Sequence, residues 1–154
     1  MSKTPPEDLI SKLLLYSNNF IANQVLITAG AEMFGPPGTL EKGLAAARRY
    51  ADCVLKIKDH DLDLKEGSGI SRQNRMSAKT FIKVLEAFEP YRHLMRREEM
   101  DFYKTGTLDG ISTRAGYIEQ SDGSLFYYVI MMNTPGKSTK PVMKKILQLV
   151  SKQS

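Results

Sequence analysis

YKTGTLDGISTRAGYIEQSDGSLFYYVIMM, residues 103–132, is the stretch of sequence that decides the fold. β-Branched and aromatic residues recur in it between turn residues, which predicts strands over 103–108, 113–120 and 125–132. Ser121-Asp122-Gly123-Ser124 predicts a hairpin turn between the last two strands. The strand over 125–132 has no polar face, so we expect both of its faces to be covered.

Helical patterns lie on both sides of this predicted meander. They run from Pro5 past Leu14, from Phe20 to Thr28 with an end at Gly30, from Leu40 to about Lys58, from Ala78 to Phe88, and from Ser138 or Thr139 to Val150. Residues 59–76 read as a loop. The chain is therefore predicted to be α+β, with residues 1–154 forming one domain or part of one. A meander of three strands leaves an apolar edge, so we expect the sheet to take further strands that this chain does not supply.

Composition sets broad limits on function. Of the 154 residues, 42% are hydrophobic and 25% are charged, as in ordinary globular proteins. No apolar run is long enough to span a bilayer, and the first ten residues lack the apolar core of a signal peptide. The net charge of +5 raises nucleic-acid binding as an alternative, which would show salt-sensitive retention on DNA. The basic residues are scattered, however, and the densest groups are predicted on helices: Arg92, Arg96, Arg97, Lys140, Lys144 and Lys145.

The residues that most often bind metals or form disulfides are few. Cys53 is the single cysteine, so no intrachain disulfide can form, and its Ala-rich helical context predicts a buried, inert thiol. His60 and His93 have no cysteine or histidine neighbour at metal-ligand spacing. We therefore predict neither a metal site nor a cofactor.

Two short motifs stand out, and each is weak alone. Lys104-Thr105-Gly106 begins a predicted strand, where Lys104 could simply be a solvated edge lysine. Ser17-Asn18-Asn19 lies between two predicted helices and could be an ordinary helix end followed by an N-cap. Gly67-Ser68-Gly69 suggests a flexible loop or a phosphate loop, but no G-x-x-x-x-G-K-[ST] pattern is present. Together, S-x-N followed by K-T-G is typical of β-lactamases and penicillin-binding proteins.

Three longer stretches extend this match: SNNFIANQV, EGSGISRQNRMSAKT and YKTGTLDGISTRAGYIEQSDG, in that order. In these the chain resembles the C-terminal segment of the low-molecular-mass penicillin-binding D-alanyl-D-alanine carboxypeptidases with endopeptidase activity, the branch with large inserted domains. The resemblance covers most of residues 6–134. It implies a β-lactamase/transpeptidase-like domain, and substrates that are peptidoglycan stem peptides ending in D-Ala-D-Ala, with β-lactams as inhibitors. It also implies a periplasmic or otherwise extracytoplasmic location for the parent enzyme.

The resemblance gives each motif residue an expected role in acyl transfer. Ser17 would pass a proton toward the leaving amine, and Asn19 would hydrogen-bond the substrate backbone and the general-base lysine of the family's first motif. Lys104 would supply positive potential. Thr105 and Thr107 would bind the terminal carboxylate, and the Thr107 N–H would be one half of the oxyanion hole. Gly106 would let the substrate approach the strand closely.

One family motif is missing. No serine of the 154 residues is followed three positions later by lysine, so the S-x-x-K motif with its nucleophile is absent. We therefore expect a piece of a longer enzyme that is inactive as an isolated chain and that dimerises through an exposed sheet edge. The alternative is a non-catalytic interaction module that retains the fold.

Overall fold

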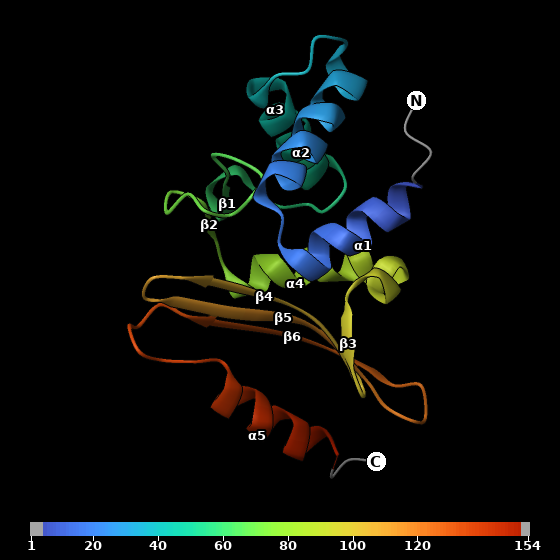
Figure 1. Ribbon diagram of the computed structural model, residues 1–154, viewed down its shortest axis with the longest axis vertical. Helices are drawn as coiled ribbons and strands as arrows, with labels where there is room; N and C mark the ends of the chain where they lie inside the picture. The colour runs from blue at the N-terminus through green and yellow to red at the C-terminus, as the bar shows by residue number, and fades with distance from the viewer. Residues whose placement is uncertain (1–4, 152–154) are drawn as a thin grey trace. The chain divides into compact units, whose positions relative to one another are not determined.

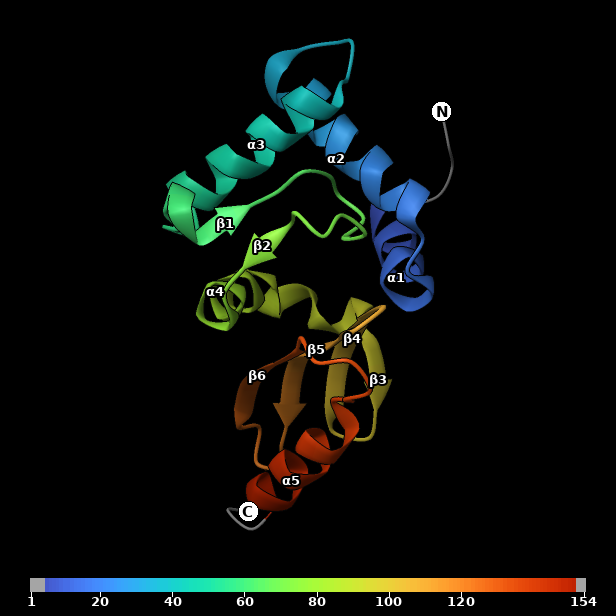
Figure 2. The same cartoon turned by 90° about the vertical axis from the view of Figure 1, so that its left-hand side faces the viewer.

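The computed structural model describes residues 5–151, which form two compact units (Figures 1 and 2). The first unit extends to Val84 and the second begins at Leu85. Helices and antiparallel strands occur together, which confirms the α+β class. The single domain over residues 1–154 stays a prediction. Among the described helices, none is both long and apolar enough to cross a membrane.

Helices α2 and α3 of the first unit pack closely against each other through glycines. Helix α1 spans Pro6–Tyr16, α2 spans Asn19–Phe34 and α3 spans Leu40–Cys53. The prediction that α2 ends at Gly30 is wrong. A Cβ atom on Gly30 would lie 2.4 Å from the backbone nitrogen of Gly43, so this glycine serves the contact with α3 and not a helix end.

The prediction for Cys53 is also wrong, because its thiol is exposed. Helix α3 ends at Cys53 and does not continue to Lys58. The buried side of α3 carries Gly43, Ala46 and Ala51. Cys53 lies two residues beyond Ala51, which places it about 200° around the helix on the opposite side.

The rest of the first unit is a long connection that leads into a capped helix, α4, in which the boundary between the two units falls. It contains the 3₁₀ turn η1 at Asp59–Asp61 and the two short paired strands β1 at Leu62–Asp63 and β2 at Arg75–Met76. Helix α4 spans Ala78–Phe88, and its Thr80 N–H donates to the Ser77 hydroxyl at 3.0 Å, as the predicted N-cap requires.

The second unit is built on an antiparallel sheet in the order β3-β4-β5-β6. Strands β4 at Asp101–Leu108, β5 at Ile111–Glu119 and β6 at Leu125–Met132 are the predicted meander. Strand β3 at Arg96–Glu98 adds a fourth strand and corrects the expected three. Arg96 and Arg97 therefore lie on a strand, and not on a helix as their spacing suggested.

Both faces of this sheet are covered, as the apolar strand β6 predicts. Helix α5, at Lys140–Val150, runs along one face (Figures 1 and 2). The core beneath α5 includes Tyr103, Ile118, Tyr128, Ile130, Met143 and Val150. On the other face, the fully buried Tyr117 donates a hydrogen bond to the Leu85 carbonyl at 2.6 Å. The turn η2, at Glu89–Leu94, is tied to the same face by the Arg92–Glu119 ion pair at 2.6 Å.

Candidate active-site motifs

Ser17 is held at the junction of α1 and α2. It is the C-cap of α1, with left-handed φ and ψ of 53° and 48°, and its N–H donates to the Leu13 carbonyl at 2.9 Å. Asn18 is the N-cap of α2, since its Oδ1 accepts from the Ile21 N–H at 3.0 Å. Asn19 then begins α2, and all three side chains are exposed. The predicted helix junction is confirmed, and it displays both Ser17 and Asn19 on the surface of the first unit.

The K-T-G motif lies on an open strand edge in the second unit. Strand β3 pairs with β4 only at residues 101–103. Beyond that point, Thr105, Gly106 and Thr107 pair with β5 alone among the described residues. They are also exposed. Backbone groups along this edge are therefore available to a ligand that lies as an additional strand.

Lys104 is positioned by the same strand. Its Nζ donates to the Thr105 carbonyl at 2.7 Å, and burial lowers the pKa of its ammonium group. Because side chains alternate along a strand, Lys104 and Gly106 face one side of the sheet and Thr105 and Thr107 face the other. A lysine with a lowered pKa gives up its proton more readily than a solvated one.

A buried charge network supports the strand beneath these threonines. The Arg114 guanidinium donates to Asp101 Oδ2 at 2.5 Å, and the Tyr128 hydroxyl donates to Asp101 Oδ1 at 2.8 Å. Arg114 also stacks over the Tyr103 ring at 3.6 Å. Burial raises the pKa of Asp101 despite its two hydrogen-bond donors. Since Arg114 is the register partner of Thr105, this network fixes the strand pair that carries the motif.

The glycine-rich loop is ordered from within by Glu66. The backbone N–H groups of Ser68, Gly69 and Ser71 donate to its carboxylate at 2.6, 2.9 and 3.2 Å. Asn74 Nδ2 adds a fourth donor at 2.7 Å, and the Ser68 hydroxyl a further one. The flexible-loop interpretation is therefore wrong. An external phosphate is not needed to satisfy these N–H groups, since an internal carboxylate already does so. This role of Glu66 could not be predicted from the sequence, because nothing local marks an acidic residue as an acceptor for the loop after it.

Acidification should loosen this loop at an unusually low pH. Burial disfavours the ionised Glu66, but the hydrogen bonds from Ser68, Ser71 and Asn74 outweigh it and lower its pKa to about 2. The folded pKa is depressed, so this stabilisation is present above about pH 4.5 and is lost as the pH falls toward about 2. In NMR spectra, the Gly69 and Ser71 amide signals should titrate with a midpoint near 2. A midpoint near 4.5 would contradict the hydrogen bonds to the Glu66 carboxylate.

The Glu66→Gln variant should lower the free energy of unfolding by about 2 kcal/mol, because an amide NH₂ then faces backbone donors. The matched control is Glu32→Gln, an exposed change in the same unit that should leave the urea midpoint unchanged.

The proposed site residues are thus divided between the units. Ser17 and Asn19 belong to the first, and Lys104 to Thr107 belong to the second. Within residues 5–151, no group of three or more His, Cys, Asp or Glu side chains is arranged to hold a metal ion.

Solved structures define the class to which this fold belongs. Penicillin binding protein 4 of Haemophilus influenzae, complexed with a β-lactam, matches 95% of this chain and 41% of its own, with a TM-score of 0.74 and 21% identity. A predatory endopeptidase of Bdellovibrio bacteriovorus, in complex with an immunity protein, matches 97% of this chain and 44% of its own, with a TM-score of 0.74 and 22% identity. The fold is therefore that of the penicillin-binding class.

The sequence identifies the family within that class. The D-Ala-D-Ala carboxypeptidase 3 (S13) family matches residues 2–100, and the chain belongs to this family. The D-alanyl-D-alanine carboxypeptidase DacB of Haemophilus influenzae is 26% identical to this chain over an alignment of 165 residues. The alignment covers 92% of this chain. The chain spans about a third, 34%, of the length of that relative.

Proposed function

We propose that this chain supplies the second and third motifs of a serine-type D-Ala-D-Ala carboxypeptidase or endopeptidase that acts on peptidoglycan stem peptides. The open β4 edge over Thr105–Thr107 carries the proposal, because it is an edge on which a peptide can align. Family membership and the β-lactam complex of the structural relative agree with it. We also propose an extracytoplasmic location, since members of a cell-wall peptidase family act there.

In the proposed reaction, the serine of an S-x-x-K motif attacks the carbonyl of the D-Ala-D-Ala peptide bond. An ester to the enzyme forms as the C–N bond breaks, and water then hydrolyses the ester. Ser17 relays the proton that the leaving amine takes up, and Asn19 hydrogen-bonds the substrate backbone. Lys104, with its lowered pKa, supplies positive charge and favours proton transfer.

The strand edge provides the remaining groups. Hydroxyls of Thr105 and Thr107 bind the terminal carboxylate, and the Thr107 N–H donates to the oxyanion. Gly106 carries no Cβ, so a substrate can approach the strand closely. A Cβ atom there would meet only the Thr113 hydroxyl oxygen, at 2.7 Å. Each of these roles belongs to one motif residue. Each can therefore be tested by a single substitution in an active complex of this chain with the S-x-x-K segment.

The isolated chain should not react with penicillin. Because the 154 residues contain no S-x-x-K motif, we expect an acylation rate lower by at least about 10⁴-fold than that of an enzyme with its nucleophile. Intact mass spectrometry after incubation with a reactive penicillin should show the unmodified chain. Adding a polypeptide that carries the S-x-x-K segment should then produce an adduct on that polypeptide. A stoichiometric adduct on this chain would contradict the proposal, and mapping it would identify another nucleophile.

Self-association is the second expected property of the isolated chain. Strand β6 pairs only with β5 among the described residues, which leaves its outer edge open to another strand. We expect the 17.3 kDa chain to form a dimer through such pairing as its concentration rises. Light scattering across a concentration series should detect the doubled mass, whereas a constant monomer mass would exclude this association.

A further inference from the structure

The loop between β1 and β2 packs against the first two turns of helix α2 (Figure 2). Its Gly67 N–H donates a hydrogen bond to Asn23 Oδ1 at 2.7 Å, across 44 positions of the sequence. A Cβ atom on Gly67 would lie 2.9 Å from the Ala22 carbonyl oxygen and 3.2 Å from the Leu26 Cβ. The backbone of the loop therefore touches the helix directly, and this contact lies within the first unit.

Asn23 lies one helical turn after Asn19, the last residue of the S-x-N motif. Residues four positions apart on an α-helix share a face, so the loop contacts α2 on the face that carries Asn19. Asn19 begins the helix and Asn18 is its N-cap. Whatever fixes the first two turns of α2 therefore also fixes the backbone of the motif.

Helix α1 gives the motif little support from the other side. None of the residues Pro6–Tyr16 is buried. Ser17, which joins the two helices, is exposed, and the large apolar side chains on either side of the motif, Tyr16 and Phe20, are 74% and 72% exposed. Segments with few buried contacts are the first to open in a folded protein. Within the first unit, the restraint on the motif therefore comes from the α2 side.

The loop can restrain the helix because Glu66 orders it. The Glu66 carboxylate accepts hydrogen bonds from four nitrogen donors of the loop. One of these donors belongs to Asn74, whose Oδ1 also accepts from the Lys65 N–H at 2.7 Å, so the two ends of the loop are joined. Gly67 directly follows Glu66. Its N–H is therefore already held in place when it donates to Asn23, and little further entropy is lost in that contact.

We propose that Asn23 and Glu66 are positioning residues, which hold Ser17 and Asn19 in the arrangement that acyl transfer needs. Asn23 accepts the hydrogen bond that joins loop and helix, and Glu66 orders the loop that supplies it. Neither residue needs to touch the substrate. The inference rests on the proposed function, because the roles proposed for Ser17 and Asn19 are what make their placement important.

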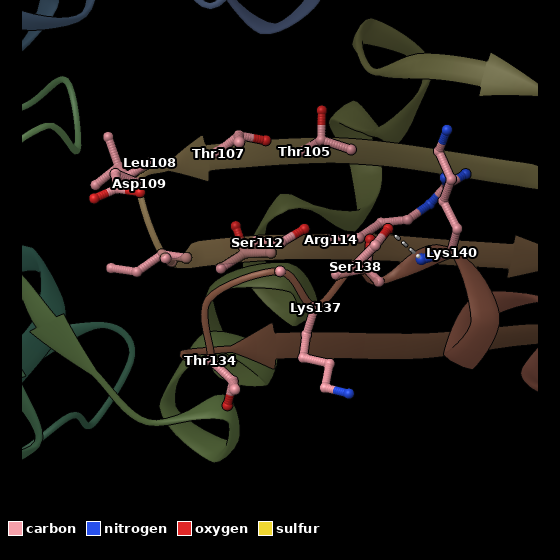
Figure 3. A pocket seen from close by; sticks show the side chains of 15 residues that line it. Thr105, Thr107, Leu108, Asp109, Ser112, Arg114, Thr134, Lys137, Ser138 and Lys140 are labelled. Atoms are coloured by element: carbon pink, nitrogen blue, oxygen red, sulfur yellow. Dashed lines mark hydrogen bonds between the residues drawn. The ribbon is translucent and has the colours of Figure 1, made fainter.

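The K-T-G motif has a separate support. It lies in the second unit, where the pair of Arg114 and Asp101 fixes the strands that carry it. Its residues Thr105 and Thr107 line the pocket shown in Figure 3. The NMR signals of these two threonines therefore serve as a reference, and we expect them to stay unchanged when the loop is detached from α2.

The test is hydrogen exchange of the ¹⁵N-labelled 154-residue chain, followed by NMR. Ala22 and Gly43 give matched signals, because each N–H donates at 3.0 Å to the carbonyl of the N-cap of its helix. In Asn23→Ala, exchange should be about fivefold faster at Ala22, from the loss of one hydrogen bond, and unchanged at Gly43. Alanine favours a helix more than asparagine does, so helix propensity alone would slow the exchange. Unchanged exchange at Ala22, or equal acceleration at Gly43, would overturn the proposal.

Further variants locate the effect in the loop contact. Gln24→Ala is the control, because it removes an amide side chain from the next, exposed position of α2 and should leave exchange at Ala22 unchanged. Gly67→Ala should accelerate this exchange, since its methyl group would push the loop away from the helix. Glu66→Gln should do the same by disordering the loop. Equal effects of Gln24→Ala and Asn23→Ala would contradict the assigned contact.

Acylation by penicillin tests the consequence for the reaction, in the complex of this chain with the S-x-x-K polypeptide. We expect Asn23→Ala to slow acylation by about tenfold and Asn23→Asp, which keeps the acceptor oxygen, to restore it. Ser17→Ala tests the proposed function itself. Slow acylation with Ser17→Ala but a normal rate with Asn23→Ala would overturn the positioning role alone. A normal rate with Ser17→Ala would refute the proposed proton relay, and the exchange measurement would still decide whether Asn23 holds the helix.

Discussion

The Gly116→Ala variant is expected to lose the sheet of the second unit. Gly116 lies opposite Tyr103 in the register of β4 and β5. A Cβ atom at this position would lie 1.9 Å from the Phe102 carbonyl oxygen and 2.8 Å from the Tyr103 Cα. Both are backbone atoms of β4, so no side-chain rotation relieves the overlap. We expect the free energy of unfolding to fall by about 3 kcal/mol, near the upper end for overpacking. Urea denaturation followed by far-UV circular dichroism measures it.

Gly106→Ala is the matched control on the neighbouring strand. The new methyl group would meet only the Thr113 hydroxyl oxygen, at 2.7 Å, and this side chain can turn away. Removing a glycine from the unfolded chain favours folding by up to about 1 kcal/mol, so the net change should be small. Equal losses in the two variants would show that β4 and β5 do not approach as closely as the structure has them.

Breaking the Asp101 network should have the second-largest effect. Asp101 is 2% exposed and accepts hydrogen bonds from Arg114 and Tyr128. Burial offsets much of the attraction within such a pair, as the raised pKa of Asp101 shows. Removing one partner is different, because it leaves the other charge buried without compensation. For Asp101→Asn we expect the free energy of unfolding to fall by about 3 kcal/mol.

Asp63→Asn provides the comparison for Asp101→Asn. Asp63 pairs with Lys65 at 2.8 Å, but both side chains are about half exposed, at 48% and 46%. Solvent-exposed pairs of this kind contribute less than about 1 kcal/mol. The two substitutions are chemically identical, so the difference between their urea midpoints measures the effect of burial. A loss for Asp101→Asn no larger than that for Asp63→Asn would contradict the network.

The elements with strong local signals could be predicted from the sequence, and those formed by long-range pairing could not. The meander over β4, β5 and β6 follows from its apolar alternation and its turns. Strand β3 was not predicted, because Arg96–Glu98 consists of charged, exposed residues with little strand propensity. It forms by pairing with β4. Gly30 was mistaken for a helix end, since a sequence does not distinguish a terminating glycine from one at a helix crossing.

The same division applies to the candidate site. The sequence predicted Ser17 between two helices and Lys104 on a strand, and both positions are confirmed. It did not predict that the K-T-G edge would be left open, because that depends on how short β3 is. The hydrogen bonds from the loop to Glu66 were not predicted, because the donor groups come near its carboxylate only in the folded loop. Residue roles in catalysis stay proposals that substitution must test.

The left-handed backbone at Ser17 limits how this protein can be engineered for thermal stability. A φ of 53° after a helix suits glycine, and serine is less stable there by about 1 kcal/mol. Any stabilisation scheme that ranks positions by backbone preference would therefore select Ser17→Gly early. The more durable variant would lack the hydroxyl that we propose as the proton relay. Thermal stability and the proposed proton relay therefore conflict at Ser17. A stabilised variant should keep this serine and gain its stability from substitutions at other positions.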